Sequence, residues 1–464
     1  MDLLGFSLAF IGDISGDGCD ELVVGIPRHD GAGMHDSGRV SIFLGMPGLL
    51  ASPNPLPAPA TILSSEAQAM IDGQTDKGWF GASVATAKDA NGNFLKDLLI
   101  GAPGSGPVND PAALLGSVYQ VEMPTILDVG ELATAQPGVA IAASPVPPGT
   151  PGISGSPQFG YVITAHRILN GSLPGDRFGH AIAFVGNLDG VAGQEFLVGA
   201  PQYAPELAGF LSTDKGYARL FRLGSATPLI QIDGTQPLTF QHGIPYGEAF
   251  GFSVAGGFDI GGPGPLGAPD GLPDLVIGSP LFNVDASIPN AALPRAGRVR
   301  AFSVVLSAPP VQVVTPLLVD QSGNNGTVMI GANHEDQFGY SVAVLPDVNL
   351  DGSPEIIGGA WQGAIDLLST TQCSSPPSRT ALGGYAFVYS PGSPNPQTPI
   401  LQFYGDQERD HMGRAVAAEN LYGTSSRPEI VLTGLGWSPE GAVSGINTEL
   451  GKGFIWDGDT VMLP

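Results

Sequence analysis

One pattern of residues recurs six times along the 464-residue chain. Each copy opens with a large apolar residue followed by Gly. It continues through a short apolar run, an acidic loop and a second apolar run, and ends at Gly-x-Pro or a remnant of it. Because repeated units bury their apolar faces against one another, this pattern constrains the fold more than any other feature. The opening steps are Leu4-Gly5, Phe80-Gly81, Phe178-Gly179, Phe250-Gly251, Phe338-Gly339 and Met412-Gly413.

Each repeat contains four short segments with the alternation of half-buried β-strands, and no long segment has helical periodicity. The first follows the opening step, the second follows the acidic loop and the third begins with Gly. The fourth is weaker, and we expect it at 61–63, 167–169, 327–329 and 460–463. Four-stranded units repeated in this way predict an all-β protein, a β-propeller of four-stranded blades.

The six repeats make one expected propeller domain over residues 1–464. The apolar start of the chain, 1–11, lacks the basic region and cleavage site of a signal peptide, so we expect it to be the first strand. A seventh blade would require sequence upstream of Met1. The expected repeats run over about 1–75, 76–173, 174–245, 246–333, 334–407 and 408–464.

The repeats resemble the FG-GAP repeats that build the propellers of integrin α subunits. Three features carry the resemblance, which covers essentially the whole chain: the Phe-Gly step, a nine-residue acidic loop and Gly-Ala-Pro, which is complete at 101–103 and 199–201. Near matches stand at 25–27 and 278–280, and the last two repeats lack the Pro. The resemblance implies structural calcium ions in the acidic loops and macromolecular ligands on the opposite face.

The acidic loops have the oxygen side chains that calcium prefers, at loop positions 1, 3, 5 and 9. The first, second and fifth loops supply all four positions. The third has Val191 at position 5, the fourth is stretched by an insertion, and the sixth has lost its ligands. The candidate metal ligands are Asp13, Ser15, Asp17, Glu21, Asp89, Asn91, Asn93, Asp97, Asn187, Asp189, Glu195, Asp259, Asp270, Asp274, Asp347, Asn349, Asp351 and Glu355.

We therefore expect about three to five Ca²⁺ sites. An EF-hand-type loop is a competing interpretation, but such loops continue to a twelfth position and a helix, whereas an apolar strand follows here. The other interpretation is a solvated acidic turn without metal.

On the face opposite the acidic loops, aromatic residues follow the Gly-x-Pro corner in four repeats. The candidate ligand-binding residues are Tyr203, Phe282, Trp361 and Trp437, with Arg28 and His29 at the matching place in the first repeat. Exposed aromatic side chains often anchor proteins or sugars. The alternative is that they pack between blades as core.

The net charge of the chain restricts the classes of partner that it can bind. The formal net charge is −25, so a nucleic-acid partner is not expected, and no segment is long and apolar enough to span a membrane. No catalytic motif is present, so we do not expect an enzyme.

The two cysteines, Cys19 and Cys373, lie in loops expected on opposite faces, so no disulfide between them is predicted.

The favoured function is a calcium-stabilised, integrin-α-like propeller that acts as an extracellular or cell-surface binding or adhesion module for a protein or glycan ligand. Weak calcium sites suit that location because the ion is abundant there. The alternative is a carbohydrate-binding or carbohydrate-active propeller, such as a lectin, lyase or glycosidase. A third interpretation is a purely structural spacer within a larger secreted protein.

Overall fold

The structure is a computed structural model. It describes residues 2–13, 20–31, 33–43, 67, 69–87, 97–106, 114–122, 140–142, 164–188, 194–202, 215–235, 239–241, 244–261, 269–284, 295–306, 312–316, 329–333, 335–362, 383–391, 398–405, 411–419, 429–434 and 452–456. These residues form strands, turns and irregular segments without a helix among them, which confirms the all-β expectation.

The chain divides into two compact units. Unit 1 comprises Met1–Phe184, Gln202–Phe210 and Leu220–Leu229. Unit 2 comprises Val185–Pro201, Leu211–Arg219 and Ile230–Pro464.

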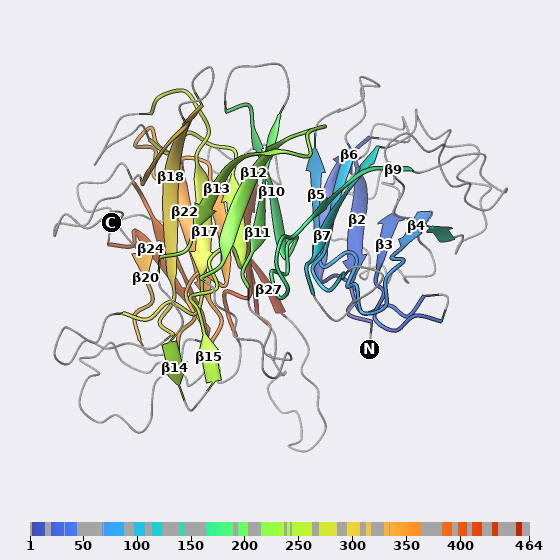
Figure 1. The fold of residues 1–464 in the computed structure, drawn as a ribbon. Helices are drawn as coiled ribbons and strands as arrows, with labels where there is room; N and C mark the ends of the chain where they lie inside the picture. The colour runs from blue at the N-terminus through green and yellow to red at the C-terminus, as the bar shows by residue number, and fades with distance from the viewer. Residues whose placement is uncertain are drawn as a thin grey trace, which may run out of the picture. The chain divides into compact units, whose positions relative to one another are not determined.

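The first two repeats each fold into one sheet whose main strands are antiparallel and follow chain order. Strands of both sheets are labelled in Figure 1. The first sheet has the order β1-β2-β3-β4-β8, and the second has the order β5-β6-β7-β9. The first consists of β1 (Ser7–Gly12), β2 (Glu21–Ile26), β3 (Arg39–Phe43), β4 (Ala69–Asp72) and the short parallel β8 (Ala140–Ala142). The second consists of β5 (Ser83–Ala87), β6 (Asp97–Ala102), β7 (Ser117–Glu122) and β9 (Thr164–Asn170).

The next two repeats keep the same strand order. The third sheet consists of β10 (Ala181–Gly186), β11 (Glu195–Ala200), β12 (Tyr217–Arg222) and β13 (Pro228–Asp233). The fourth consists of β16 (Ser253–Gly256), β17 (Leu275–Ser279), β18 (Arg298–Leu306) and β19 (Gln312–Pro316), with β20 (Met329–Ile330) also paired to β18. A separate hairpin, β14 (Thr239–Gln241) with β15 (Ile244–Tyr246), lies between them in the sequence.

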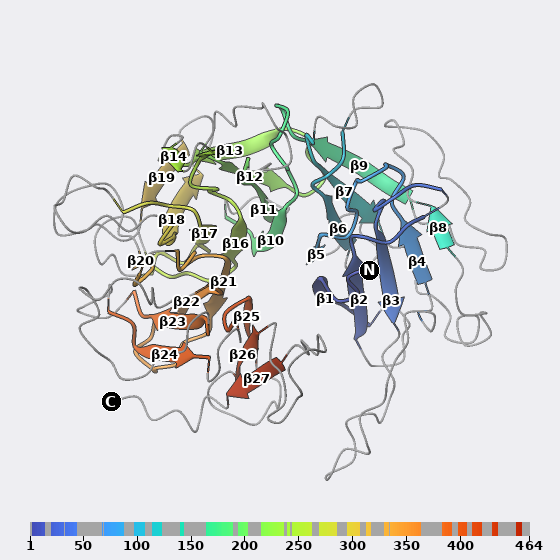
Figure 2. The ribbon, with the colours of Figure 1, turned by 90° about the horizontal axis from the view of Figure 1, so that it is seen from below.

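In the fifth repeat four strands lie side by side in chain order (Figure 2). They are β21 (Ser341–Leu345), β22 (Glu355–Ala360), β23 (Tyr385–Tyr389) and β24 (Leu401–Tyr404). The sixth sheet has three strands among the described residues: β25 (Ala415–Glu419), β26 (Glu429–Gly434) and β27 (Lys452–Trp456). Each of the first five repeats thus contributes four strands in chain order to one sheet, and the sixth contributes three among the described residues, so the sheets are the blades of a β-propeller fold.

Two of the expected fourth strands differ from the observed ones. In the first repeat the fourth strand is β4, and the expected segment 61–63 lies outside the described residues. In the fourth repeat β20 includes only Met329 of the expected segment and pairs with the first two residues of β18. Because β18 is nine residues long, its other half needs a second partner, and β19 fills that place. The expected segment 167–169 lies within β9 as predicted, and 460–463 is outside the described residues.

The Phe-Gly steps join each repeat to the one before it. Their phenylalanines are buried, with no more than 1% of each exposed, and the backbone of each forms a parallel bridge to the glycine that precedes the third strand of the preceding repeat. The bridged pairs are Gly38 with Phe80, Gly116 with Phe178, Gly216 with Phe250, Gly297 with Phe338 and Gly384 with Met412.

Glycine is required in these steps for two reasons, as Gly81 illustrates. Its φ of +84° is a conformation that residues with a Cβ rarely adopt. A Cβ at this position would also lie 2.6 Å from the carbonyl oxygen of Arg39. The glycine is therefore needed both for close packing of neighbouring backbones and for the left-handed backbone conformation.

Hydroxyl groups form a second link between repeats. The first residue of the first strand is serine in four repeats, and its hydroxyl donates to the carbonyl oxygen of the following Phe-Gly or Met-Gly glycine at 2.8 Å. The pairs are Ser7 with Gly81, Ser83 with Gly179, Ser253 with Gly339 and Ser341 with Gly413.

Candidate metal loops and ligand face

The fifth acidic loop connects β21 to β22 and draws three carboxylates together. Asp347, Asp351 and Glu355 each place one oxygen within 4.8 Å of the others, and they are the one such group among the described residues. Carboxylate oxygens at this spacing are suited to a divalent cation.

The backbone of the same loop wraps around the side chain of Asp347. Its two oxygens accept the N–H groups of Asp351 at 3.1 Å and of Gly352 at 2.8 Å. Gly352, at loop position 6, has a φ of +94°, a backbone conformation that glycine adopts readily and that allows the sharp turn of this loop.

Glu355, at loop position 9, begins β22 and is 0% exposed. One oxygen accepts the N–H of Val348 at 2.7 Å, while Oε1 has no hydrogen-bond partner among the described residues. Burial, with added repulsion from Asp351 and Asp347, raises the pKa of Glu355 to about 8. An orphaned oxygen on a buried carboxyl that faces two further carboxylates is a place where a cation would be stabilised.

The fourth loop repeats this backbone turn despite its insertion, although its carboxylates Asp259, Asp270 and Asp274 do not form a group at the spacing of the fifth loop. Asp259 accepts the N–H groups of Asp270 at 3.3 Å and of Gly271 at 2.5 Å, as Asp347 does for its own turn. In the fifth loop the first of these N–H donors, Asp351, comes four positions after Asp347. In the fourth loop the matching donor, Asp270, comes eleven positions after Asp259. The insertion therefore does not prevent the two ends of the fourth loop from forming the same bonds as those of the fifth.

Asp274 occupies the place of Glu355 in this loop and is equally buried. One oxygen accepts the N–H groups of Ile260 at 2.6 Å and Gly261 at 3.0 Å, and Oδ1 has no hydrogen-bond partner among the described residues. Burial, together with Asp259 and Asp270, raises the pKa of Asp274 to about 8.

The remaining loops are described only at their ends. Their position-9 carboxyls, Glu21, Asp97 and Glu195, are all 0% exposed. Glu195 accepts the N–H of Leu188 at 2.8 Å, the same bond that Glu355 forms, and burial raises its pKa. Asp13 and Asn187 are half-buried or exposed at the ends of their first strands. Ser15, Asp17, Asp89, Asn91, Asn93 and Asp189 lie outside the described residues, as do Cys19 and Cys373.

At the opposite end of β22, Trp361 lies in a half-buried cluster. Its indole N–H donates to Gln337 at 3.0 Å, and its ring contacts Tyr340 and His411. The guanidinium of Arg414 lies 4.4 Å from the ring centre of Tyr340 and 5.0 Å from that of Trp361. The sequence pattern predicted only Trp361 of this cluster. Tyr340, His411 and Arg414 lie directly beside the opening steps of the fifth and sixth repeats, and that position is the sequence signal that could have indicated them.

The other aromatic candidates have different surroundings. Phe282 is half-buried beneath Arg298, whose guanidinium carbon lies 3.9 Å from the ring centre. Tyr203 and Trp437 lie outside the described residues.

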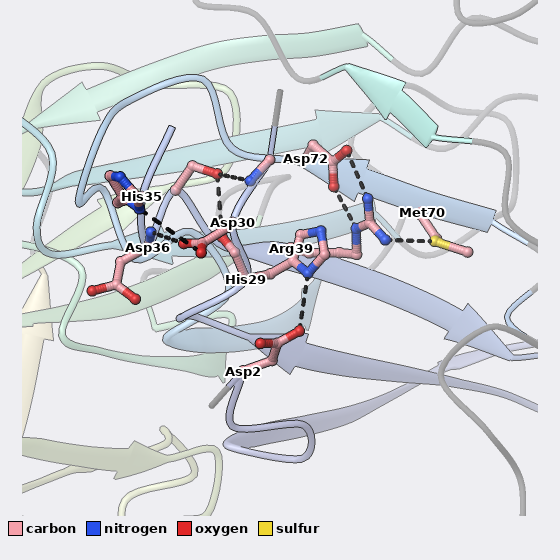
Figure 3. A network of polar contacts seen from close by, with 10 residues as sticks. Asp2, His29, Asp30, His35, Asp36, Arg39, Met70 and Asp72 are labelled. Carbon is pink, nitrogen blue, oxygen red and sulfur yellow. Dashed lines mark hydrogen bonds and ion pairs between the residues drawn. The ribbon is translucent and has the colours of Figure 1, made fainter. Parts of the chain in front are cut away.

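The matching loop of the first repeat is held by polar contacts (Figure 3). Nδ1 of His29 lies 3.3 Å from a carboxylate oxygen of Asp2, and Asp30 accepts the N–H of Asp36 at 2.8 Å. Arg39 at the start of β3 binds Asp72 of β4 through two bonds. His29 therefore supports the local loop structure, while Arg28 has its backbone N–H bonded to Asp2.

A buried acidic residue two positions before the Phe-Gly step was missed from the sequence. Asp176, Glu248 and Asp336 are 0% exposed and accept backbone N–H groups of the loop before the next repeat. The recurring Asp/Glu-x-Phe-Gly spacing is the signal that marks them. Their role is to hold the loops that lead into the third, fourth and fifth repeats.

Comparisons with known proteins agree with this architecture. Residues 4–43 match the FG-GAP repeat family. The chain is 28% identical over 279 residues to integrin alpha-PS2 of Drosophila melanogaster, covering 60% of this chain and 15% of that protein. It is 28% identical over 301 residues to integrin alpha-V of Gallus gallus, covering 63% and 21%.

A shorter match, to integrin alpha-8 of Mus musculus, is 35% identical over 104 residues. The chain thus spans about a fifth or less of the length of these relatives. Among the described residues no helix is long and apolar enough to cross a membrane. The similarity to integrin α chains is consistent with the expectation that the chain is not an enzyme. The repeated sheets, the family match and these relatives show that the chain contains an FG-GAP repeat and is similar to integrin α chains over about 60% of its length.

Proposed function

We propose that this chain is a calcium-stabilised propeller that acts as an extracellular or cell-surface adhesion module. The observation that carries the proposal is the fifth acidic loop, where the buried, unpaired Oε1 of Glu355 faces Asp347 and Asp351. The integrin α relatives support the adhesion role and the location at the cell surface.

In the fifth loop the ion would be held by Asp347, Asn349, Asp351 and Glu355, with a backbone carbonyl at position 7 of the loop. In the fourth loop it would be held by Asp259, Asp270 and Asp274. The matching residues of loops one to three complete a proposed set of about three to five sites. A bound calcium ion supplies positive charge that offsets the repulsion among the carboxylates and ties the first strand to the second.

The proposed ligand surface lies at the other end of the blades. In the fifth repeat Trp361 and Glu355 stand at opposite ends of β22, so the metal loop and the aromatic cluster are separated by the length of the strand. A half-buried group of Trp361, Tyr340, His411 and Arg414 offers apolar faces together with one fixed cation, which suits a protein partner.

Cell attachment to surfaces coated with the purified chain tests the proposal. We expect attachment in calcium, its loss in excess chelator and its reduction in the variant Asp347→Ala with Asp351→Ala. Trp361→Ala should reduce attachment while leaving calcium-dependent melting unchanged. Equal attachment to the chain and to an inert protein would contradict the adhesion role. Binding to one class of glycan on an array, lost in Trp361→Ala, would favour the carbohydrate-binding alternative.

A further inference from the structure

We infer that Ser390 and Ser303 are positioning residues of the fifth and fourth metal loops; this inference rests on the proposed calcium function. Neither serine lies in an acidic loop. Each stands six positions after the glycine that opens the third strand of its repeat, Gly384 or Gly297. Both are buried.

Strand register brings each serine to a metal-loop carboxylate. In the fifth sheet Ile356 pairs with Tyr389, so the next residues toward the acidic loop, Glu355 and Ser390, stand opposite one another. In the fourth sheet Leu275 pairs with Phe302, so the next residues are Asp274 and Ser303. Residues opposite one another in an antiparallel pair have side chains on the same face, about 4.5–5.5 Å apart at Cβ.

In the fifth sheet the hydroxyl already contacts the metal loop. Ser390 donates to Oδ2 of Asp351 at 2.8 Å. The same oxygen accepts the side-chain amide of Asn349 at 2.9 Å, and Oδ1 accepts the N–H of Ser353 at 2.9 Å. These bonds fix the plane of a carboxylate that is otherwise on an exposed turn. Groups that orient a metal ligand in this way commonly change metal affinity when they are removed.

In the fourth sheet the same position holds an unsatisfied hydroxyl. Ser303 is 1% exposed, and its hydroxyl has no hydrogen-bond partner among the described residues. Oδ1 of Asp274, the residue just before β17, has none there either. Two buried polar atoms without partners are unfavourable as they stand. An ion that draws Asp270 and Asp274 together would give Ser303 a carboxylate to which it can donate.

The sequence links this serine to one form of loop. The fourth and fifth loops end in Asp-Gly-x-Pro followed by Asp or Glu, and these two repeats have the serine. The same offset in the other repeats holds Leu44, Glu122, Arg222 and Asp457. The hydroxyl therefore accompanies the two loops of the Asp-Gly-x-Pro form, whereas the first repeat, which has Asp17 and Glu21 without that Pro, has Leu44 at this place.

Calcium titration of the intact chain, followed by melting temperature and by native mass spectrometry, tests the inference. For Ser390→Ala we expect the fifth site to need about tenfold more free calcium for half-occupancy, within the range typical of groups that support metal ligands. Ser390→Thr, which retains the hydroxyl, should restore the wild-type midpoint. Ser279→Ala is the matched control, because Ser279 is a buried serine in β17 without a hydrogen-bond partner among the described residues, at the end away from the metal loop.

The double variant Asp351→Ala with Ser390→Ala separates positioning from general stability. If Ser390 acts through Asp351, adding Ser390→Ala should cause no further loss of bound calcium. A Ser390→Ala chain that melts earlier by the same amount at every calcium concentration, with an unchanged midpoint, would overturn the inference while leaving the calcium sites standing. A wild-type chain that does not respond to calcium would overturn the proposed function itself.

Discussion

The hydroxyl of Ser83 donates to the carbonyl oxygen of Gly179 at 2.8 Å, across 96 positions of sequence. Both residues belong to opening segments of successive repeats, and equivalent bonds occur at Ser7, Ser253 and Ser341. The third repeat has Ala181 at this place. The bond therefore joins neighbouring blades wherever the repeat supplies a serine.

Ser83→Ala should lower the free energy of unfolding by about 1 kcal/mol, because it removes one buried hydrogen bond between repeats. Urea-induced unfolding measures the loss. Ser225→Ala is the control, since the hydroxyl of Ser225 bonds the backbone of Thr227 only two positions away. Equal losses of unfolding free energy in the two variants would show that the bond between repeats contributes no more to stability than a local hydrogen bond.

Two glycines of the opening steps allow the cost of backbone strain to be measured separately from the cost of a steric clash. Gly5 and Gly81 have φ values of +83° and +84°, but a Cβ added at Gly5 would meet no atom within 4 Å, whereas one added at Gly81 would. Gly5→Ala should therefore cost only the backbone strain, about 1–2 kcal/mol. Gly81→Ala should cost clearly more, since its Cβ would meet the carbonyl of Arg39. Equal shifts in melting temperature would contradict the close approach of the first two repeats.

The fold and the acidic loop that draws Asp347, Asp351 and Glu355 together could be predicted because their signals are local. Phe-Gly, the acidic loop and Gly-x-Pro each fix a turn or a buried residue near themselves. The fourth strand in the fourth repeat could not be placed, because β18 extends beyond β20 and its partner is chosen by strand length. Ser390 was missed for a similar reason, since only the register of β22 with β23 brings it to the metal loop.

A buried ion pair supports the fourth repeat. Arg298 at the start of β18 donates to Glu248 at 2.5 Å, and both side chains are buried. Glu248→Gln should destabilise the fold by about 3–5 kcal/mol, because it leaves the guanidinium buried without its counter-charge.

Asp72→Asn is the matched comparison for that substitution. It breaks the pair with Arg39, the residue that matches Arg298 in the first repeat. The side chains of this pair are more exposed, so the substitution should cost less. Thermal unfolding of both variants measures the difference. A larger loss for Asp72→Asn would contradict burial as the reason.

Calcium-free stability should depend on pH. Burial raises the pKa of Glu355 and of Asp274 to about 8, so the fold favours their protonated forms. The stability from this preference is fully present below about pH 4, where unfolded carboxyls are also protonated, and it is lost as pH rises toward 8. We expect the melting temperature of the chelated chain to fall between pH 5 and pH 8.

The variant Glu355→Gln with Asp274→Asn isolates this effect from the overall charge of the chain. Its melting temperature in chelator should fall less over the same range. A pH dependence identical to that of the wild type would contradict the assignment to these two carboxyls.

The most direct test of the account is thermal unfolding in calcium and in excess chelator at pH 7.5. An ion that binds only the folded chain stabilises it by about 2.7 kcal/mol per site at a hundredfold excess over its dissociation constant. We predict a higher melting temperature in calcium, with a smaller rise in the variant Asp347→Ala with Asp351→Ala. Identical melting temperatures in calcium and chelator would show that the acidic loops are empty turns and would contradict the account.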